Sequence, residues 1–188
     1  QTMMGPGIDP HLYQATARDV QTLNRAEVIL YSGYGLEGQL GDVLARYAER
    51  VPTLAVSEAG LSREDLITTD DAYGVDPHLW MDVSLWANTV PVIAAQLSQS
   101  APDCAATINA NAQAYGGELA ALHEWATQTI ASIPQTQRIL VTAHDAFAYY
   151  GLAYDIEVAG IQGISTQSEA AIADIRQTAD LIVEREVP

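Results

Sequence analysis

A long stretch without any strand pattern separates two regions in which short apolar runs alternate with helical patterns. It extends from Pro102 to about Ile133, and only the Gly116-Gly117 pair interrupts its helical residues. Proline favours the first turn of a helix, so Pro102 suits the start. Thirty residues at a rise of 1.5 Å each form a rod of roughly 45 Å, which is long for a helix inside one globular domain. We therefore predict one long helix that joins two lobes and bends, if anywhere, at the glycine pair.

Both flanking regions have the alternation of strand and helix that is typical of parallel sheets. Apolar runs consistent with buried strands occur at residues 27–31, 53–56, 138–142 and 156–161. Helical patterns occur at residues 15–26, 36–49, 84–98, 146–153 and 168–185, the last with Ser168 as a candidate N-cap. We predict an α/β fold of two Rossmann-like lobes with mostly parallel sheets. Residues 1–101 form the N-terminal lobe, 102–133 the linking helix, and 134–188 a partial C-terminal lobe.

Both ends of the chain resemble interior points of this pattern. Residues 1–4 have the character of the end of a strand, and the chain stops at residues 187–188, where a lobe of this kind enters its next strand. We therefore expect a chain that is truncated at both ends. An incomplete C-terminal lobe has an uncovered sheet edge, and such an edge favours self-association.

The composition excludes several classes of partner and site. The chain has 24 acidic residues against 8 basic ones, a net charge of −16, and arginine as its only basic residue type apart from histidine. Nucleic-acid binding needs a basic surface and is not expected. Cys104 is the single cysteine, which excludes an intramolecular disulfide and a multi-thiolate zinc site. The acidic balance attracts cations in a general way, although a strongly solvated surface is the favoured explanation.

A histidine-containing heptapeptide occurs twice, as GIDPHLY at residues 7–13 and GVDPHLW at residues 74–80. A third histidine, His144, follows at a nearly equal interval within TAHDAF, and the chain has only four histidines. Proline fixes its own φ and holds the preceding residue extended, so the residue after it is presented at a defined angle. Imidazole is a common ligand of late first-row metal ions. We predict that His11, His78 and His144 form one metal site.

Two aspartates are predicted to support the metal site, whereas the fourth histidine is predicted to lie outside it. Asp9 and Asp76 are suited to orient the neighbouring backbone or to accept hydrogen bonds from the ligands. His123 lies in the middle of the predicted long helix, and we expect it to be a surface or helix-packing residue and not a ligand.

Two other functions compete with simple metal binding. Residues 33–38 read GYGLEG between an expected strand and helix, and Glu58 follows at the distance of a ribose-binding acid, so a dinucleotide-binding module is one alternative. Against it, Leu36 and Glu37 crowd the helix start where a pyrophosphate must lie. The second alternative is a metal-dependent hydrolase, because three histidines also activate water in metallohydrolases. We assign no catalytic residue.

Four segments together resemble one family, the zinc- and manganese-binding solute-binding proteins of ABC importers, of the TroA/ZnuA type. These segments are GIDPHLY, DPHLWMD at residues 76–82, TAHDAF, and GIST at residues 163–166, and the likeness covers nearly the whole chain in order. The resemblance implies two α/β lobes bridged by one long helix, with the metal between them. His11 and His78 match the family's ligands from the first lobe, and His144 matches the ligand from the second.

The resemblance also implies a function and a place. It describes a periplasmic or cell-surface receptor that delivers Zn²⁺ or Mn²⁺ to the membrane permease of an ABC importer, and not an enzyme. A histidine in the third position leans toward zinc or toward mixed zinc- and manganese-binding members. The family's fourth ligand, a carboxylate, lies further along than this chain extends, and its usual first strand and helix are also missing. The histidine-rich loop of some zinc-binding members is represented only by Asp70 and Asp71.

Overall fold

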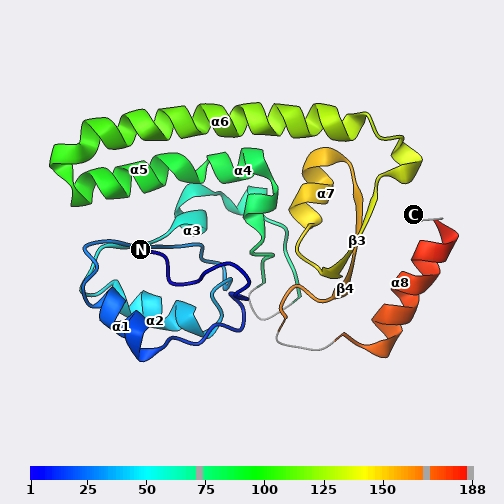
Figure 1. Ribbon diagram of the computed structural model, residues 1–188, viewed down its shortest axis with the longest axis horizontal. Helices are drawn as coiled ribbons and strands as arrows, with labels where there is room; N and C mark the ends of the chain where they lie inside the picture. The colour runs from blue at the N-terminus through cyan, green and yellow to red at the C-terminus, as the bar shows by residue number, and fades with distance from the viewer. Residues whose placement is uncertain (71–73, 167–169, 186–188) are drawn as a thin grey trace.

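Two parallel sheets, one in each half of the molecule, and one long helix that extends along both halves make up the fold (Figure 1). The structure is a computed structural model that describes residues 1–70, 74–166 and 170–185. The elements of the first half are α1 (Ala17–Leu23), β1 (Ile29–Tyr31), α2 (Gln39–Tyr47), β2 (Thr53–Ala55), α3 (Val56–Gly60), α4 (Val83–Ala87) and α5 (Thr89–Ser100). They are followed by α6 (Ala105–Ala131), β3 (Ile139–His144), α7 (Ala148–Tyr154), β4 (Glu157–Gln162) and α8 (Ile172–Glu184).

The sheet of the first half consists of β1 and β2, which pair in parallel from Ile29↔Thr53 to Tyr31↔Ala55. Helices α1 and α2 cover it, and their apolar residues meet those of β1 in a core of Leu23, Ile29, Leu40 and Leu44. In α2, Leu40 and Leu44 lie one turn apart, so both side chains point to the sheet.

The sheet of the second half consists of β3 and β4, also parallel, with pairs from Ile139↔Glu157 to His144↔Gln162. His144 is therefore the last residue of β3. In parallel sheets, ligands bind beyond the carboxyl ends of the strands. The predicted α/β class with parallel sheets is confirmed. The topology places His144 at the carboxyl end of β3, the edge of a parallel sheet where ligands commonly bind.

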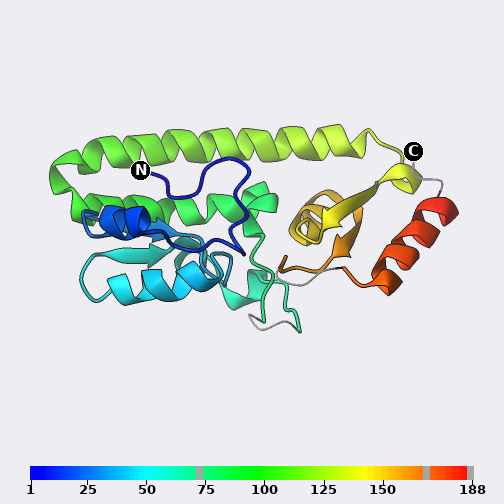
Figure 2. The same cartoon turned by 60° about the horizontal axis from the view of Figure 1, so that its bottom comes forward.

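Helix α6 extends along both halves of the molecule in both views, with α4 and α5 packed along the part of it that belongs to the first half (Figures 1 and 2). A short 3₁₀ turn at Pro102–Cys104 precedes it, and Gly116 and Gly117 do not interrupt it. The predicted long helix is confirmed. The division of the chain at residues 101 and 133 stays a prediction.

Three local predictions are wrong, and for the first of them the structure shows a tertiary reason. The helix expected at residues 84–98 is divided at Asn88 into α4 and α5. At this break the backbone of Gly60 in α3 comes so close that an added Cβ would lie 2.9 Å from the Cα of Thr89. Val56 begins α3 instead of ending β2. Residues 1–4 form no strand, and the side chains of Met3 and Met4 pack on the core of α1, β1 and α2.

The last helix begins later than expected. The N-cap of α8 is Ala171, and the carboxylate of Asp174 accepts a hydrogen bond from its backbone N–H at 3.2 Å. The predicted N-cap Ser168 and the acidic residue Asp71 lie outside the described residues. Within the described ranges, no helix combines the length and the apolar character needed to cross a membrane.

Candidate metal centre

His11, His78 and His144 meet at one point, although they come from three distant parts of the chain. His11 lies in the loop before α1, His78 precedes the 3₁₀ turn that leads into α4, and His144 ends β3. The Nε2 atom of His78 is 3.1 Å from Nε2 of His11 and 3.2 Å from Nε2 of His144. One nitrogen from each ring lies within 4.8 Å of the other two. The structure thus brings the predicted residues together, while their role as ligands stays a prediction.

The ring of His78 is fixed by a fully buried carboxylate. Oδ1 of Asp76 accepts hydrogen bonds from the backbone N–H of His78 at 3.0 Å and from its ring Nδ1 at 2.7 Å. Because Nδ1 carries the proton that is donated to Asp76, Nε2 presents a lone pair to the other two rings. Asp76 therefore sets both the orientation and the tautomer of His78.

The ring of His144 is fixed by backbone. Its Nδ1 donates to the carbonyl oxygen of Gly163 at 2.9 Å, so its Nε2 also presents a lone pair toward His78. The chain after His144 crosses close to β4, where a Cβ added to Gly160 would lie 2.7 Å from the Cα of Asp145. A glycine at position 160 is thus needed for the turn that follows His144.

His11 is held by its backbone from two sides. Its N–H donates to Oδ1 of Asp9 at 2.9 Å, and Oδ2 of Asp9 accepts a hydrogen bond of 2.6 Å from the hydroxyl of Thr166. Thr166 belongs to the other half of the molecule, so Asp9 links the two halves beside the histidines. On the opposite side, Gly38 adopts φ +49° and lies so close to the carbonyl of His11 that a Cβ has no room.

The charge state of the cluster suits a cation. Burial, followed by the positive charges that His78 and His144 carry when protonated, lowers the pKa of His11 from 6.5 to about 4. Its ring is therefore neutral at neutral pH, the state that binds metal. Burial works to raise the pKa of Asp9, but the hydroxyl of Thr166 and the N–H of His11 outweigh it and lower that pKa below its ordinary value. Asp9 thus contributes a negative charge near the rings.

The glycine-rich loop at residues 33–38 is occupied by the protein's own carboxylates. Glu37 accepts hydrogen bonds from the backbone N–H groups of Ser32 at 2.6 Å and Gly33 at 3.2 Å, and Glu58 accepts one from Tyr34 at 2.9 Å. These are the donors that a pyrophosphate needs in a dinucleotide site. The loop instead supports His11 through Gly38, and the dinucleotide alternative loses its binding site.

Other polar features lie apart from the three histidines. His123 packs within the structure, with Nδ1 3.2 Å from the hydroxyl of Tyr154, as expected for a helix-packing residue. The ring of Trp80 contacts that of His78 edge to face, with centroids 5.4 Å apart.

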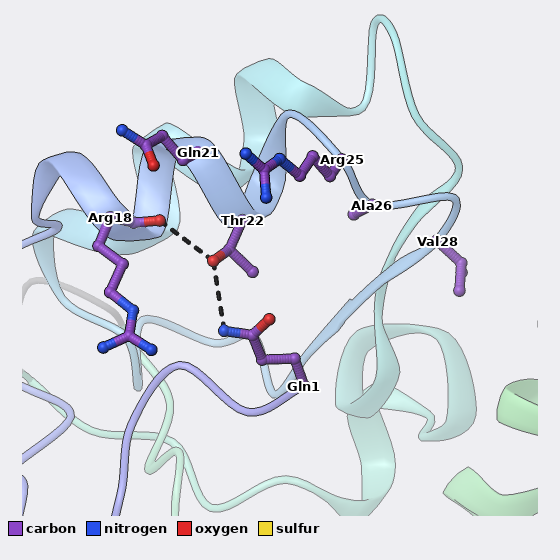
Figure 3. A pocket seen from close by; sticks show the side chains of 7 residues that line it. All are labelled: Gln1, Arg18, Gln21, Thr22, Arg25, Ala26 and Val28. Atoms are coloured by element: carbon purple, nitrogen blue, oxygen red, sulfur yellow. Dashed lines mark hydrogen bonds between the residues drawn. The ribbon is translucent and has the colours of Figure 1, made fainter.

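Figure 3 shows a separate hollow of about 420 Å³ beside α1. Arg18 and Arg25 line it, and a hydrogen bond of 3.4 Å joins Gln1 to Thr22 within it. Two guanidinium groups repel a cation, so this hollow does not compete with the histidine cluster as a metal site.

Thr166, Gly163 and Tyr149 are supporting residues that residue patterns alone did not reveal. Gly163 and Thr166 lie in the GIST segment that carries part of the family resemblance, but nothing in their own sequence indicates a contact with the histidines. Tyr149, whose hydroxyl donates a hydrogen bond to the carbonyl of Asp76 at 3.1 Å, falls in an expected short helix without any distinguishing mark.

Known proteins resemble the chain over almost its whole length. The manganese-binding lipoprotein MntA of Bacillus subtilis is 42% identical over 186 residues, which are 99% of this chain and 60% of that relative. The zinc-binding protein TroA of Treponema pallidum is 40% identical over the same shares of the two chains. The solved structure of periplasmic zinc-binding TroA from Treponema pallidum superposes with a TM-score of 0.94, covering 98% of this chain and 66% of that one.

The chain spans about 60% of the length of these curated relatives. The family model of ZnuA, described as the periplasmic component A of the zinc-uptake complex, matches residues 1–188. With the matching fold and the gathered histidines, this match shows that the chain belongs to the ZnuA family of metal-binding solute-binding proteins.

Proposed function

We propose that this chain is the metal-capturing part of a receptor that delivers a divalent transition metal ion to an ABC importer. His11, His78 and His144 bind the ion, and the chain catalyses no reaction. The observation that carries the proposal is the convergence of their Nε2 atoms, at 3.1 and 3.2 Å from the central His78. Around a tetrahedral zinc with bonds of 2.0–2.1 Å, two ligand nitrogens lie about 3.3–3.4 Å apart. The two separations from Nε2 of His78 are close to this value, which supports a site where the three rings share one ion.

Zinc is the ion that this ligand set favours. Three imidazole nitrogens suit Zn²⁺ better than Mn²⁺, which prefers carboxylate and carbonyl oxygen. The names of the relatives include manganese-binding MntA, zinc-binding TroA and, at 29% identity, the iron-binding protein YfeA of Yersinia pestis. Since zinc prefers four ligands, water or a carboxylate completes the site. The names "periplasmic" and "lipoprotein" support a place outside the cytoplasm and a membrane permease as the receiving partner.

The test is a zinc titration against a chromophoric chelator for wild type and for four alanine variants. His11→Ala, His78→Ala and His144→Ala should each weaken binding by about 100-fold or more, because each removes a direct bond to the ion. His123→Ala is the matched control and should bind as wild type does. Equal losses at all four positions would show that the ligand set is wrong.

The same zinc-loaded protein separates capture from hydrolysis. A hydrolase would turn over ester or phosphoester substrates at rates that depend on the three histidines. We expect no turnover above that of zinc-free protein, and histidine-dependent turnover would replace the receptor proposal by the hydrolase.

A further inference from the structure

Tyr149 reaches from the second half of the molecule into the core of the first. It lies on α7, shortly after His144, and is 3% exposed. Its ring belongs to an apolar cluster whose other buried members are Leu61, Leu79 and Leu85, all from the first half. A residue on the segment of one ligand is thus buried beside the segment that carries another.

The hydroxyl of Tyr149 lies between two backbone segments, one at Ile67 and one at Asp76, just before His78. It accepts a hydrogen bond from the N–H of Ile67 at 3.0 Å and donates one to the carbonyl of Asp76 at 3.1 Å. Ile67 and Asp76 also share one direct bond, from the N–H of Asp76 to the carbonyl of Ile67 at 3.0 Å. In an antiparallel pair the two residues would exchange both bonds directly. Here the second bond passes through the tyrosine hydroxyl.

This hydroxyl keeps its proton under ordinary conditions. Burial raises the pKa of Tyr149 to about 12, so the group remains a donor to Asp76 at neutral pH. The two backbone groups that it joins lie in or near the buried interior, where an unsatisfied donor or acceptor is costly.

These contacts close a circuit through the proposed metal site. Tyr149 follows His144 by five positions, and its hydroxyl donates a hydrogen bond to the carbonyl of Asp76. The carboxylate of Asp76 in turn accepts a hydrogen bond of 2.7 Å from the ring of His78. The Nε2 of His78 then returns to within 3.2 Å of that of His144. We infer that Tyr149 is a positioning residue that sets the separation between His78 and His144. The inference rests on the proposed function of these histidines as metal ligands.

Tyr149→Phe tests this role because it removes the hydroxyl and keeps the ring in the apolar cluster. We expect unchanged secondary structure and zinc binding about 10-fold weaker, as for the loss of groups that support a ligand. Tyr150→Phe is the first control: its ring packs against Tyr154 with centroids 4.9 Å apart, and no hydrogen bond of its hydroxyl is found among the described residues. Tyr154→Phe is the second control, because its hydroxyl contacts His123 on α6 and the backbone of Val83 in α4, and among the described residues it has no hydrogen bond to Ile67 or Asp76.

Two readouts keep this inference separate from the proposed function. The first is the NMR signal of the His78 Nδ1 proton, shared with Asp76, in metal-free protein; it should shift in Tyr149→Phe and stay in place in both controls. The second is zinc affinity, which should fall only in Tyr149→Phe, whereas a merely structural role would lower thermal stability without changing affinity. An unmoved His78 signal overturns the inference. If wild type fails to bind zinc, the proposed function falls, and the His78 signal still decides the role of Tyr149.

Discussion

The two copies of the Asp-Pro-His heptapeptide make the same turn but use their aspartates differently. In both copies the aspartate accepts a hydrogen bond from the histidine backbone, at 2.9 Å for Asp9 with His11 and 3.0 Å for Asp76 with His78. Asp76 also holds the ring of its own histidine at 2.7 Å. Asp9 instead accepts the hydroxyl of Thr166, in the other half of the molecule, at 2.6 Å.

This difference shows which contacts the heptapeptide itself determines and which depend on the residues that the fold places around it. The backbone turn follows from the proline and the aspartate, so both copies form it. The second bond of the carboxylate depends on which groups surround it. In the second copy Asp76 is fully buried beside its own histidine, whereas in the first copy Asp9 faces the segment after β4. The carboxylate of the second copy therefore orients the proposed ligand His78, and the carboxylate of the first copy bonds to the other half of the molecule.

The largest contrast should come from the matched pair Asp76→Asn and Asp9→Asn. Asp76→Asn removes the charge that holds the His78 ring, and zinc affinity should fall by about 10- to 100-fold, the usual cost of losing such a support. Asp9→Asn should cost clearly less, because among the described residues the Asp9 carboxylate bonds to the backbone of His11 and to Thr166, and to no histidine ring. Zinc titrations at one pH and one salt concentration measure both. Equal losses would mean that the two aspartates play one role.

The first copy should also make the metal-free protein sensitive to acid. The pKa of His11 is lowered to about 4 in the folded protein, chiefly by burial, from its ordinary value of 6.5. Between pH 6.5 and about 4 the unfolded chain therefore takes up a proton that the folded chain does not, and stability falls as the pH falls. Above pH 6.5 this residue contributes no pH dependence.

Urea unfolding of metal-free wild type and His11→Gln at pH 7 and pH 4.5 measures this effect. The loss of unfolding free energy between the two pH values should be smaller in the variant by about 2 kcal/mol, somewhat less than the full shift of the pKa implies. The same slope in both proteins would show that His11 titrates normally in the folded state.

A smaller effect is expected from Thr166→Val, which removes the hydrogen bond between Thr166 and Asp9 and preserves side-chain shape. A hydrogen bond to a partly buried carboxylate contributes about 1 kcal/mol, so zinc should dissociate about 3- to 10-fold faster. Stopped-flow transfer of zinc to a chelator gives the rate. Adding Asp9→Asn to this variant should change little more, whereas additive losses would show that the two residues act independently.

The smallest expected effect is on the free energy of unfolding when the first glycine of either heptapeptide is replaced. Each begins with a glycine at positive φ, +80° at Gly7 and +70° at Gly74, and a Cβ added to either meets no atom of the described residues within 4 Å. Gly7→Ala and Gly74→Ala should therefore each cost only the backbone term of about 1 kcal/mol in unfolding free energy. A much larger loss at one position, measured by denaturant unfolding, would reveal a further difference between the turns.

The sequence predicts the features that depend on local periodicity. Alternating strands and helices and the long helix follow from side-chain spacing, and the histidine cluster follows from the repeated motif. The break between α4 and α5 was out of reach, because it lies where Gly60 approaches from another helix. Thr166 and Tyr149 act through bonds to residues 157 and 73 positions away, and no local pattern marks such contacts.

The contact between Trp80 and His78 gives this protein a built-in optical reporter. The two rings meet edge to face with centroids 5.4 Å apart, so the indole responds to any charge that arrives on the imidazole. Binding of a cation at Nε2 should change its fluorescence emission, and Trp80→Phe should abolish that change. The other two tryptophans, Trp86 on α4 and the 63% exposed Trp125 on α6, supply the background, which is the emission that remains in Trp80→Phe. Metal capture and release can thus be followed in unlabelled protein, in real time.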